Sequence, residues 1–154
     1  MIVEMRNPYL SFFRLHWELK KLVLQCALIL PLTHIGLELL GLKRFFKLTE
    51  GLTSLSRKTP KYPKEEAHRD AQLFSAVARR FPLRLTCLER STALCWLLRW
   101  RGVDAAVHLG VRKDLQSLDA HAWVQVGELV INDSDDITER YTRLSPGILR
   151  SQHN

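Results

Sequence analysis

The spacing of apolar and polar positions after residue 63 predicts helices first and strands afterwards. In KEEAHRDAQLFSAVARRF, residues 64–81, apolar side chains recur at helical intervals. Acidic residues stand early in this segment and two arginines stand late, as the helix dipole favours. Pro82 cannot continue a helix, so the first predicted helix ends before it.

The next stretch, TCLERSTALCWLLRWRG at residues 86–102, predicts a second helix with both of its ends marked. Thr86 and Glu89 have the spacing of a capping box, which makes Thr86 the N-cap. Cys87 is then expected to be the first helical residue. Gly102 is expected to end the helix in the left-handed conformation.

The hydrophobic pattern changes to strict alternation after this helix. Residues 103–111 alternate as a half-buried strand does, and residues 112–119 are polar and predict a loop. Residues 121–126 and 129–133 predict two further strands joined around Gly127. Helices followed by at least three sequential strands indicate an α+β domain with an antiparallel sheet. The tail beyond residue 133 fits either another strand or a short helix.

The region before residue 50 is rich in leucine and has few turn signals. Residues 22–42 are about long enough to span a bilayer, but Glu38 would be costly near its centre. The pattern favours one or two helices, broken near Pro31 or Gly41, that pack on the domain or on a partner. A membrane-surface role for residues 8–48 and a true membrane span remain the alternatives.

Composition and charge limit the number of domains that the chain can form and the kinds of partner that it can bind. The chain has 154 residues, 46% of them hydrophobic, which is enough for one domain with its own core. The polar stretch 51–63 predicts a boundary between a hydrophobic helical segment, 1–50, and a folded domain, 62–154. The net charge of +7 is spread along the chain, and the aromatics do not interleave with the basic residues. The sequence therefore predicts no nucleic-acid partner.

The three cysteines are Cys26, Cys87 and Cys95. Their odd number, and the absence of a C-x-x-C or a histidine at metal-ligand spacing, argue against a disulfide framework and a zinc site. The sequence predicts a cytoplasmic protein with reduced thiols, no metal and no cofactor.

One of these thiols has a setting that suits a nucleophile. Cys87 is expected on the first turn of its helix, where unpaired backbone N–H groups stabilise a thiolate. The competing interpretation is a cysteine buried for packing. A nucleophilic cysteine needs a base and a group that orients the base, and His121 and Asp133 stand at opposite ends of two paired strands.

The register of that strand pair decides whether the two side chains meet. His121 faces Asp133 if the loop has three or five residues centred on Gly127, whereas a two-residue loop puts Asp133 on the other face. The residues alone leave two interpretations equally open. One is a catalytic set, and the other is a core histidine with a surface aspartate.

The motifs CLERSTAL, RWRG, HLGV, HAWVQV and IND, taken in this order, resemble the transglutaminase-like cysteine peptidases of lasso-peptide biosynthesis. The resemblance covers roughly residues 65–135. It implies a transglutaminase-like, papain-like core with Cys87 as nucleophile, His121 as base and Asp133 as the orienting carboxylate. One departure is Gln125, where relatives often carry glutamate.

The resemblance also implies partners and weaker site residues. The substrate would be the leader of a lasso precursor peptide, presented by a separate leader-recognition protein, with the lasso cyclase as a further partner. Arg90 and Ser91 follow the nucleophile in the motif, and Asn132 precedes Asp133. Trp123 shares a strand face with His121, so it is a candidate wall of the cleft or a core aromatic.

Two other functions compete with the peptidase. An amidase or acyl transferase of the same fold would use the same three residues, with an amine as acceptor in place of water. A non-catalytic module that docks peptide or membrane would carry the three residues without using them, and its Cys87 would be unreactive.

Overall fold

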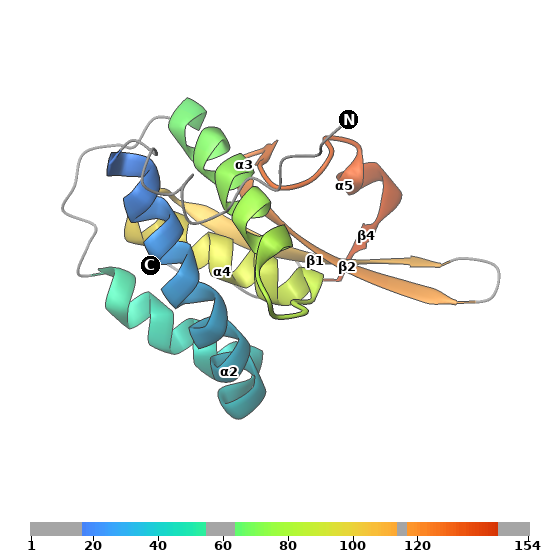
Figure 1. Ribbon diagram of the computed structural model, residues 1–154. Helices are drawn as coiled ribbons and strands as arrows, with labels where there is room; N and C mark the ends of the chain where they lie inside the picture. The colour runs from blue at the N-terminus through green and yellow to red at the C-terminus, as the bar shows by residue number, and fades with distance from the viewer. Residues whose placement is uncertain (1–16, 55–63, 114–116, 145–154) are drawn as a thin grey trace, which may run out of the picture.

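The computed structural model describes residues 17–54, 64–113 and 117–144. The elements in chain order are α2 (Trp17–Ser54), α3 (Lys64–Arg80), α4 (Cys87–Trp100), β1 (Ala105–Lys113), β2 (Leu118–Val126), β3 (Leu129–Val130), α5 (Ile137–Arg140) and β4 (Thr142–Arg143). The strands form one antiparallel sheet in the order β3-β2-β1-β4. The predicted α+β class is confirmed (Figure 1).

Helix α4 lies at the centre of the molecule. It packs against β1 and β2 on one side and against α2 and α3 on the other (Figure 1). The alternating residues Ala122, Val124 and Val126 of β2 point into this helical layer and share its core. Between them Trp123 points the opposite way. It joins a second, smaller core with residues from β3, α5 and the following turn: Val130, Ile137 and Tyr141.

Both ends of α4 match the sequence prediction. Thr86 is the N-cap and completes the capping box with Glu89. At the other end Gly102 has a φ of +83°, and the N–H groups of Gly102 and Val103 donate to the carbonyls of Arg99 and Leu98. This is the Schellman arrangement, which satisfies two of the carbonyls left over at a helix end.

Helix α2 consists of two helical arms joined at Gly41. Gly41 has φ +72° and ψ 166°, values open to glycine alone at low cost, whereas Pro31 lies inside the first arm without breaking it. Of the two predicted break positions, Gly41 is therefore the one used. The arms meet near Gly36, where an added Cβ would lie 2.4 Å from the ring of Phe45.

Hydrogen bonds and ion pairs, in addition to apolar packing, attach α2 to the C-terminal end of α4. Arg101 pairs with Asp70 of α3 and donates to Gln25 Oε1 at 2.6 Å, and Arg99 lies 3.4 Å from Glu50. The predicted boundary at residues 51–63 lies mostly outside the described residues, so the division into two units stays a prediction.

The strands differ from the predicted pattern at their ends. Residues 112–119 were expected to form a loop, but β1 extends to Lys113 and β2 begins at Leu118. The polar residues there pair across the ladder, as Arg112 does with Asp119 at 3.2 Å. Strand β3 is shorter than expected, because the chain leaves the ladder after Val130. The tail that fitted either a strand or a helix contains both, as α5 and β4.

Candidate active site

The first turn of α4 is held by a chain of hydrogen bonds that places Cys87 at its start. Glu89 Oε2 accepts from the Thr86 backbone N–H at 2.6 Å and from the Thr86 hydroxyl at 2.8 Å. The other oxygen, Oε1, accepts from His34 Nδ1 of α2 at 2.6 Å. The long apolar helix thus contacts the turn that carries the thiol.

His34 and Glu89 perturb each other's ionisation. The hydrogen bond to Glu89 raises the pKa of His34. Burial would raise the pKa of Glu89, but hydrogen bonds from Thr86 and His34 outweigh it, so this pKa is lowered. The pair is therefore ionised in the folded protein over a wider pH range than either residue alone.

This coupling predicts a pH-dependent stability. Because the pKa of folded His34 lies above its unfolded value of about 6.5, the stabilisation that comes from protonated His34 is complete below that pH. It is lost as pH rises through the folded value. We expect the Tm of wild type to fall over this range, and the Tm of His34→Gln to change less.

The measurement is differential scanning calorimetry at closely spaced pH values from 5.5 to about 9. The matched control is His68→Gln, because His68 is exposed on α3 and its ring nitrogen bonds to the neighbouring Gln72 at 3.0 Å, one turn along the same helix. A wild-type Tm profile that His34→Gln reproduces would contradict the coupling.

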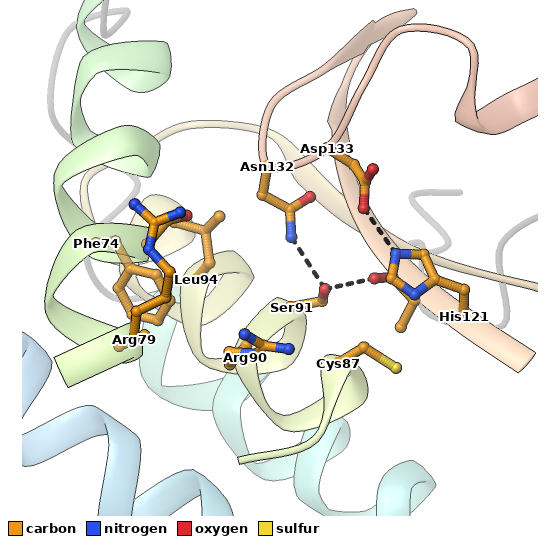
Figure 2. A pocket seen from close by; sticks show the side chains of 12 residues that line it. Phe74, Arg79, Cys87, Arg90, Ser91, Leu94, His121, Asn132 and Asp133 are labelled. Atoms are coloured by element: carbon orange, nitrogen blue, oxygen red, sulfur yellow. Dashed lines mark hydrogen bonds and ion pairs between the residues drawn. The ribbon is translucent and has the colours of Figure 1, made fainter. Parts of the chain in front are cut away.

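His121 comes from β2 and meets Asp133 beside the same turn. His121 Nε2 donates to Asp133 Oδ2 at 2.7 Å, while Asp133 Oδ1 accepts from the backbone N–H of Ser134 at 2.9 Å. With Nε2 engaged by the carboxylate, Nδ1 is left to exchange a proton with another group. In Figure 2 the Cys87 thiol points to the side of the pocket where the imidazole stands.

The pair forms by a route that the sequence prediction missed. The loop between β2 and β3 has two residues, Gly127 and Glu128, and Val126 pairs with Leu129. In this register a continued strand would carry Asp133 to the other face, so the three- or five-residue loop that would bring the two side chains together across the ladder is not the one formed. The chain bends at residues 131–133 instead and returns Asp133 to His121.

Asn132 stabilises that bend. Its Oδ1 accepts from the Val124 backbone N–H at 2.7 Å, where a strand would have offered a carbonyl. Its Nδ2 donates to Ser91 Oγ at 3.1 Å, and Ser91 Oγ donates to the Ala122 carbonyl at 2.9 Å. Asn132 and Ser91 therefore join α4, β2 and the Asp133 segment.

These residues surround a pocket of about 180 Å³. Of the residues singled out from the sequence, the pocket brings together Cys87, Arg90, Ser91, His121, Asn132 and Asp133 (Figure 2). Helix α3 and the adjoining part of α4 and β2 supply the rest of the lining, which is Phe74, Ser75, Ala78, Arg79, Leu94 and Ala122. Arg90 is exposed. The acidic residues Glu89 and Asp70 pair with other residues, Glu89 with His34 and Asp70 with Arg101.

Trp123 does not line this pocket. It is fully buried, stacks on His108 with ring centroids 5.9 Å apart, and lies over Gly110, where an added Cβ would be 2.9 Å from the indole. Of its two interpretations, the core aromatic is the one that the structure gives.

A residue that sequence reasoning missed supports His121 from the side. The ring of Tyr141 lies 5.4 Å from the imidazole, and its hydroxyl donates to Asp119 Oδ2 at 2.6 Å. This bond raises the pKa of Tyr141 and, together with Arg112, lowers the pKa of Asp119. No motif marks Tyr141, because it follows a short helix that the tail pattern left undecided.

The other two thiols are buried, and burial disfavours their reactive thiolate form. Burial raises the pKa of Cys26 to about 12 and that of Cys95 to about 11, whereas Cys87 is partly exposed. Within the described residues, no group of three or more His, Cys, Asp and Glu side chains could hold a metal ion. The arrangement offers thiol, imidazole and carboxylate around one pocket.

We expect one of the three cysteines to react in the folded protein. Iodoacetamide at pH 8 should alkylate Cys87 alone, because the thiolate is the reacting form and burial keeps Cys26 and Cys95 protonated. Intact-mass spectrometry should find one adduct per native chain and three in denaturant. The Cys87→Ala variant should give no native adduct, and a native adduct on Cys95 would contradict this assignment.

Comparisons with known proteins bear on this pocket. The sequence profile described as the transglutaminase-like superfamily matches residues 29–146, which runs from the middle of the first α2 arm past β4. The microcin J25-processing protein McjB of Escherichia coli is 41% identical over 54 residues. That match covers 35% of this chain and 25% of McjB, so it spans about a quarter of the relative's length. No solved structure matches the chain.

Proposed function

The chain belongs to the transglutaminase-like superfamily, and on that premise we propose that it is a cysteine peptidase that removes the leader from a lasso-peptide precursor. One observation carries the proposal. Cys87 begins α4 on the wall of a pocket that also holds the hydrogen-bonded pair His121–Asp133. The partial likeness to McjB, which is named for processing microcin J25, supports a role in lasso-peptide processing.

The proposed reaction is acyl transfer to water. His121 Nδ1 takes the proton of Cys87, and the thiolate attacks the scissile carbonyl to give a tetrahedral intermediate. The backbone N–H of Cys87 is free of helical partners and serves as one oxyanion donor. His121 then protonates the leaving amine, and water hydrolyses the acyl-enzyme with His121 as its base.

Asp133 acts on the imidazole rather than on the substrate. Its bond to Nε2 fixes the tautomer with Nδ1 toward the thiol and stabilises the imidazolium that forms during attack. Ser91 and Asn132 hold Asp133 in place through the bend at residues 131–133, and Tyr141 limits rotation of the ring. These three are positioning residues.

The proposal includes partners and a compartment. The substrate is the leader-bearing precursor, presented by a separate leader-recognition protein, and the released core passes to a lasso cyclase. Because the nucleophile must stay reduced, we place the protein in the cytoplasm.

A cleavage assay tests the proposal. The full-length protein is incubated with a candidate lasso precursor peptide and a candidate leader-recognition protein, and the products are identified by mass spectrometry. We expect one cut between leader and core. In heavy-oxygen water the released leader should gain one labelled oxygen at its new carboxyl terminus, which identifies water as the acceptor.

Two other outcomes would redirect the proposal. A leader joined to an added amine, without labelled oxygen, would indicate an acyl transferase of the same fold. An intact precursor in the presence of every partner, together with an unreactive Cys87, would contradict enzymatic activity.

A further inference from the structure

The first arm of α2 carries a continuous apolar stripe on its outer side. The exposed fractions are 57% at Leu24, 65% at Leu28, 52% at Leu32, 52% at Ile35 and 78% at Leu39. Their intervals of four, four, three and four residues keep them on one helical face, over a length of about 22 Å. An exposed apolar surface of this extent indicates an interaction site.

The inner side of the same arm is already occupied. Leu22, Cys26, Ile29 and Leu30 are buried in the helical core, and His34 bonds to Glu89 of α4. The helix Lys20–Leu52 is apolar and long enough to cross a membrane, with 28% of its most apolar window buried. A transmembrane position would remove this packing, so the outer stripe fits a surface contact rather than a span.

Charge around the stripe identifies its chemistry. Trp17, 65% exposed, lies at one end with the Lys21 ammonium 5.6 Å from its ring centre. Just beyond the Gly41 kink, exposed cations follow the other end, namely Lys43, Arg44 and Lys47. Among the side chains of α2 that the structure describes, Glu38 is the exposed acid. Apolar residues flanked by cations and a tryptophan match an anionic lipid surface.

We propose that the outer face of the first α2 arm binds the surface of an anionic membrane. The stripe from Leu24 to Leu39 lies in the plane of the interface, and Lys21 and the cations after the kink contact lipid phosphates. In Figure 1, α2 lies on the outside of the helical layer, away from the sheet. The exposed fractions of the stripe show that the described residues leave this face uncovered. The proposal does not depend on the peptidase reaction.

Vesicle flotation of the full-length protein tests this proposal, because floating vesicles separate bound protein from aggregates. We expect flotation with phosphatidylcholine vesicles that contain phosphatidylglycerol. With phosphatidylcholine alone, or in high salt, we expect binding to be weaker by at least about 10-fold. The variant Leu24→Gln/Leu28→Gln/Leu39→Gln should lose about 100-fold in partitioning, because three exposed side chains no longer bury apolar area.

A matched variant controls for the loss of exposed leucines in general. Leu118→Gln/Leu129→Gln/Leu144→Gln removes the same number from β2, from β3 and from the position after β4, at exposed fractions of 70%, 41% and 56%. It should bind vesicles as wild type does. Circular dichroism and Tm should be the same for all three proteins, since every substituted side chain is exposed.

Three results would overturn the proposal. The first is flotation that the stripe variant retains in full. The second is a wild-type protein that does not bind vesicles and is a dimer by light scattering, while the stripe variant is a monomer. The stripe would then bind a second copy of the chain. The third is resistance of the bound protein to extraction at alkaline pH, which would indicate a membrane span.

Discussion

Replacement of Cys87 with alanine is expected to abolish precursor cleavage, with a loss in turnover of at least about 10⁴-fold. The thiol forms the bond to the substrate, and no other sulfur in the described residues replaces it. Cys26 and Cys95 are buried, and neither lines the pocket. Alanine keeps the helix start, because the cap depends on Thr86 and Glu89 rather than on the thiol. The loss would therefore be chemical, with an unchanged Tm.

Companion variants separate the roles around Cys87. His121→Ala should lower turnover nearly as far, and the double variant should be no slower than either single one, because the two residues act as a unit. Asp133→Asn should keep binding and cost about 10²- to 10⁴-fold in turnover, since an amide no longer fixes the required tautomer. Cys95→Ala is the matched control and should cut normally.

Single-turnover cleavage followed by mass spectrometry measures these rates. Undiminished cleavage by Cys87→Ala would remove the nucleophile from the proposal. Equal rates for wild type and Asp133→Asn would leave the bond between Asp133 and His121 as a structural contact only.

Replacement of Trp123 with alanine is expected to cost about 3–5 kcal/mol of unfolding free energy. The side chain is fully buried and forms the second core with Val130, Ile137 and Tyr141. Domains of this size are stable by only about 5–15 kcal/mol, so the variant would be close to its limit at 37 °C. Because Tyr141 packs on both Trp123 and His121, turnover should fall as well.

Urea denaturation measures this effect, and the chain offers a matched control. Trp100 is 51% exposed at the end of α4, so Trp100→Ala should cost about 1 kcal/mol or less. Trp123→Phe should recover part of the stability and of the turnover, because it restores an aromatic ring. Equal costs at positions 100 and 123 would contradict the assignment of a second core.

Local signals in the sequence predicted the helix that carries Cys87 and the main strands. Thr86, Glu89 and Gly102 act within one or two turns of chain, so their patterns define α4 without its surroundings. Alternation likewise predicted β1 and β2, although their ends extend through polar residues that gain partners across the ladder.

The contacts that complete the site depend on tertiary structure. Asp133 reaches His121 only because Asn132 ends the strand by bonding to Val124 and Ser91, and no periodicity encodes that bend. Tyr141 lies beside His121 because α5 packs Ile137 under Trp123. The hydrogen bond between His34 and Glu89 joins residues 55 positions apart, and no local sequence pattern predicts that contact.

The ribosome makes α2 before it makes the residues of α4 that α2 packs against, so α2 waits for its partners during synthesis. The α2 arm leaves the ribosome long before the residues that cover its inner face. Glu89 follows His34 by 55 residues, and Arg101 follows Gln25 by 76. At about 5–20 residues per second, roughly 3–15 s pass before α2 can dock. Every nascent copy therefore exposes the inner face of this apolar segment as well as its outer stripe until α4 has been made.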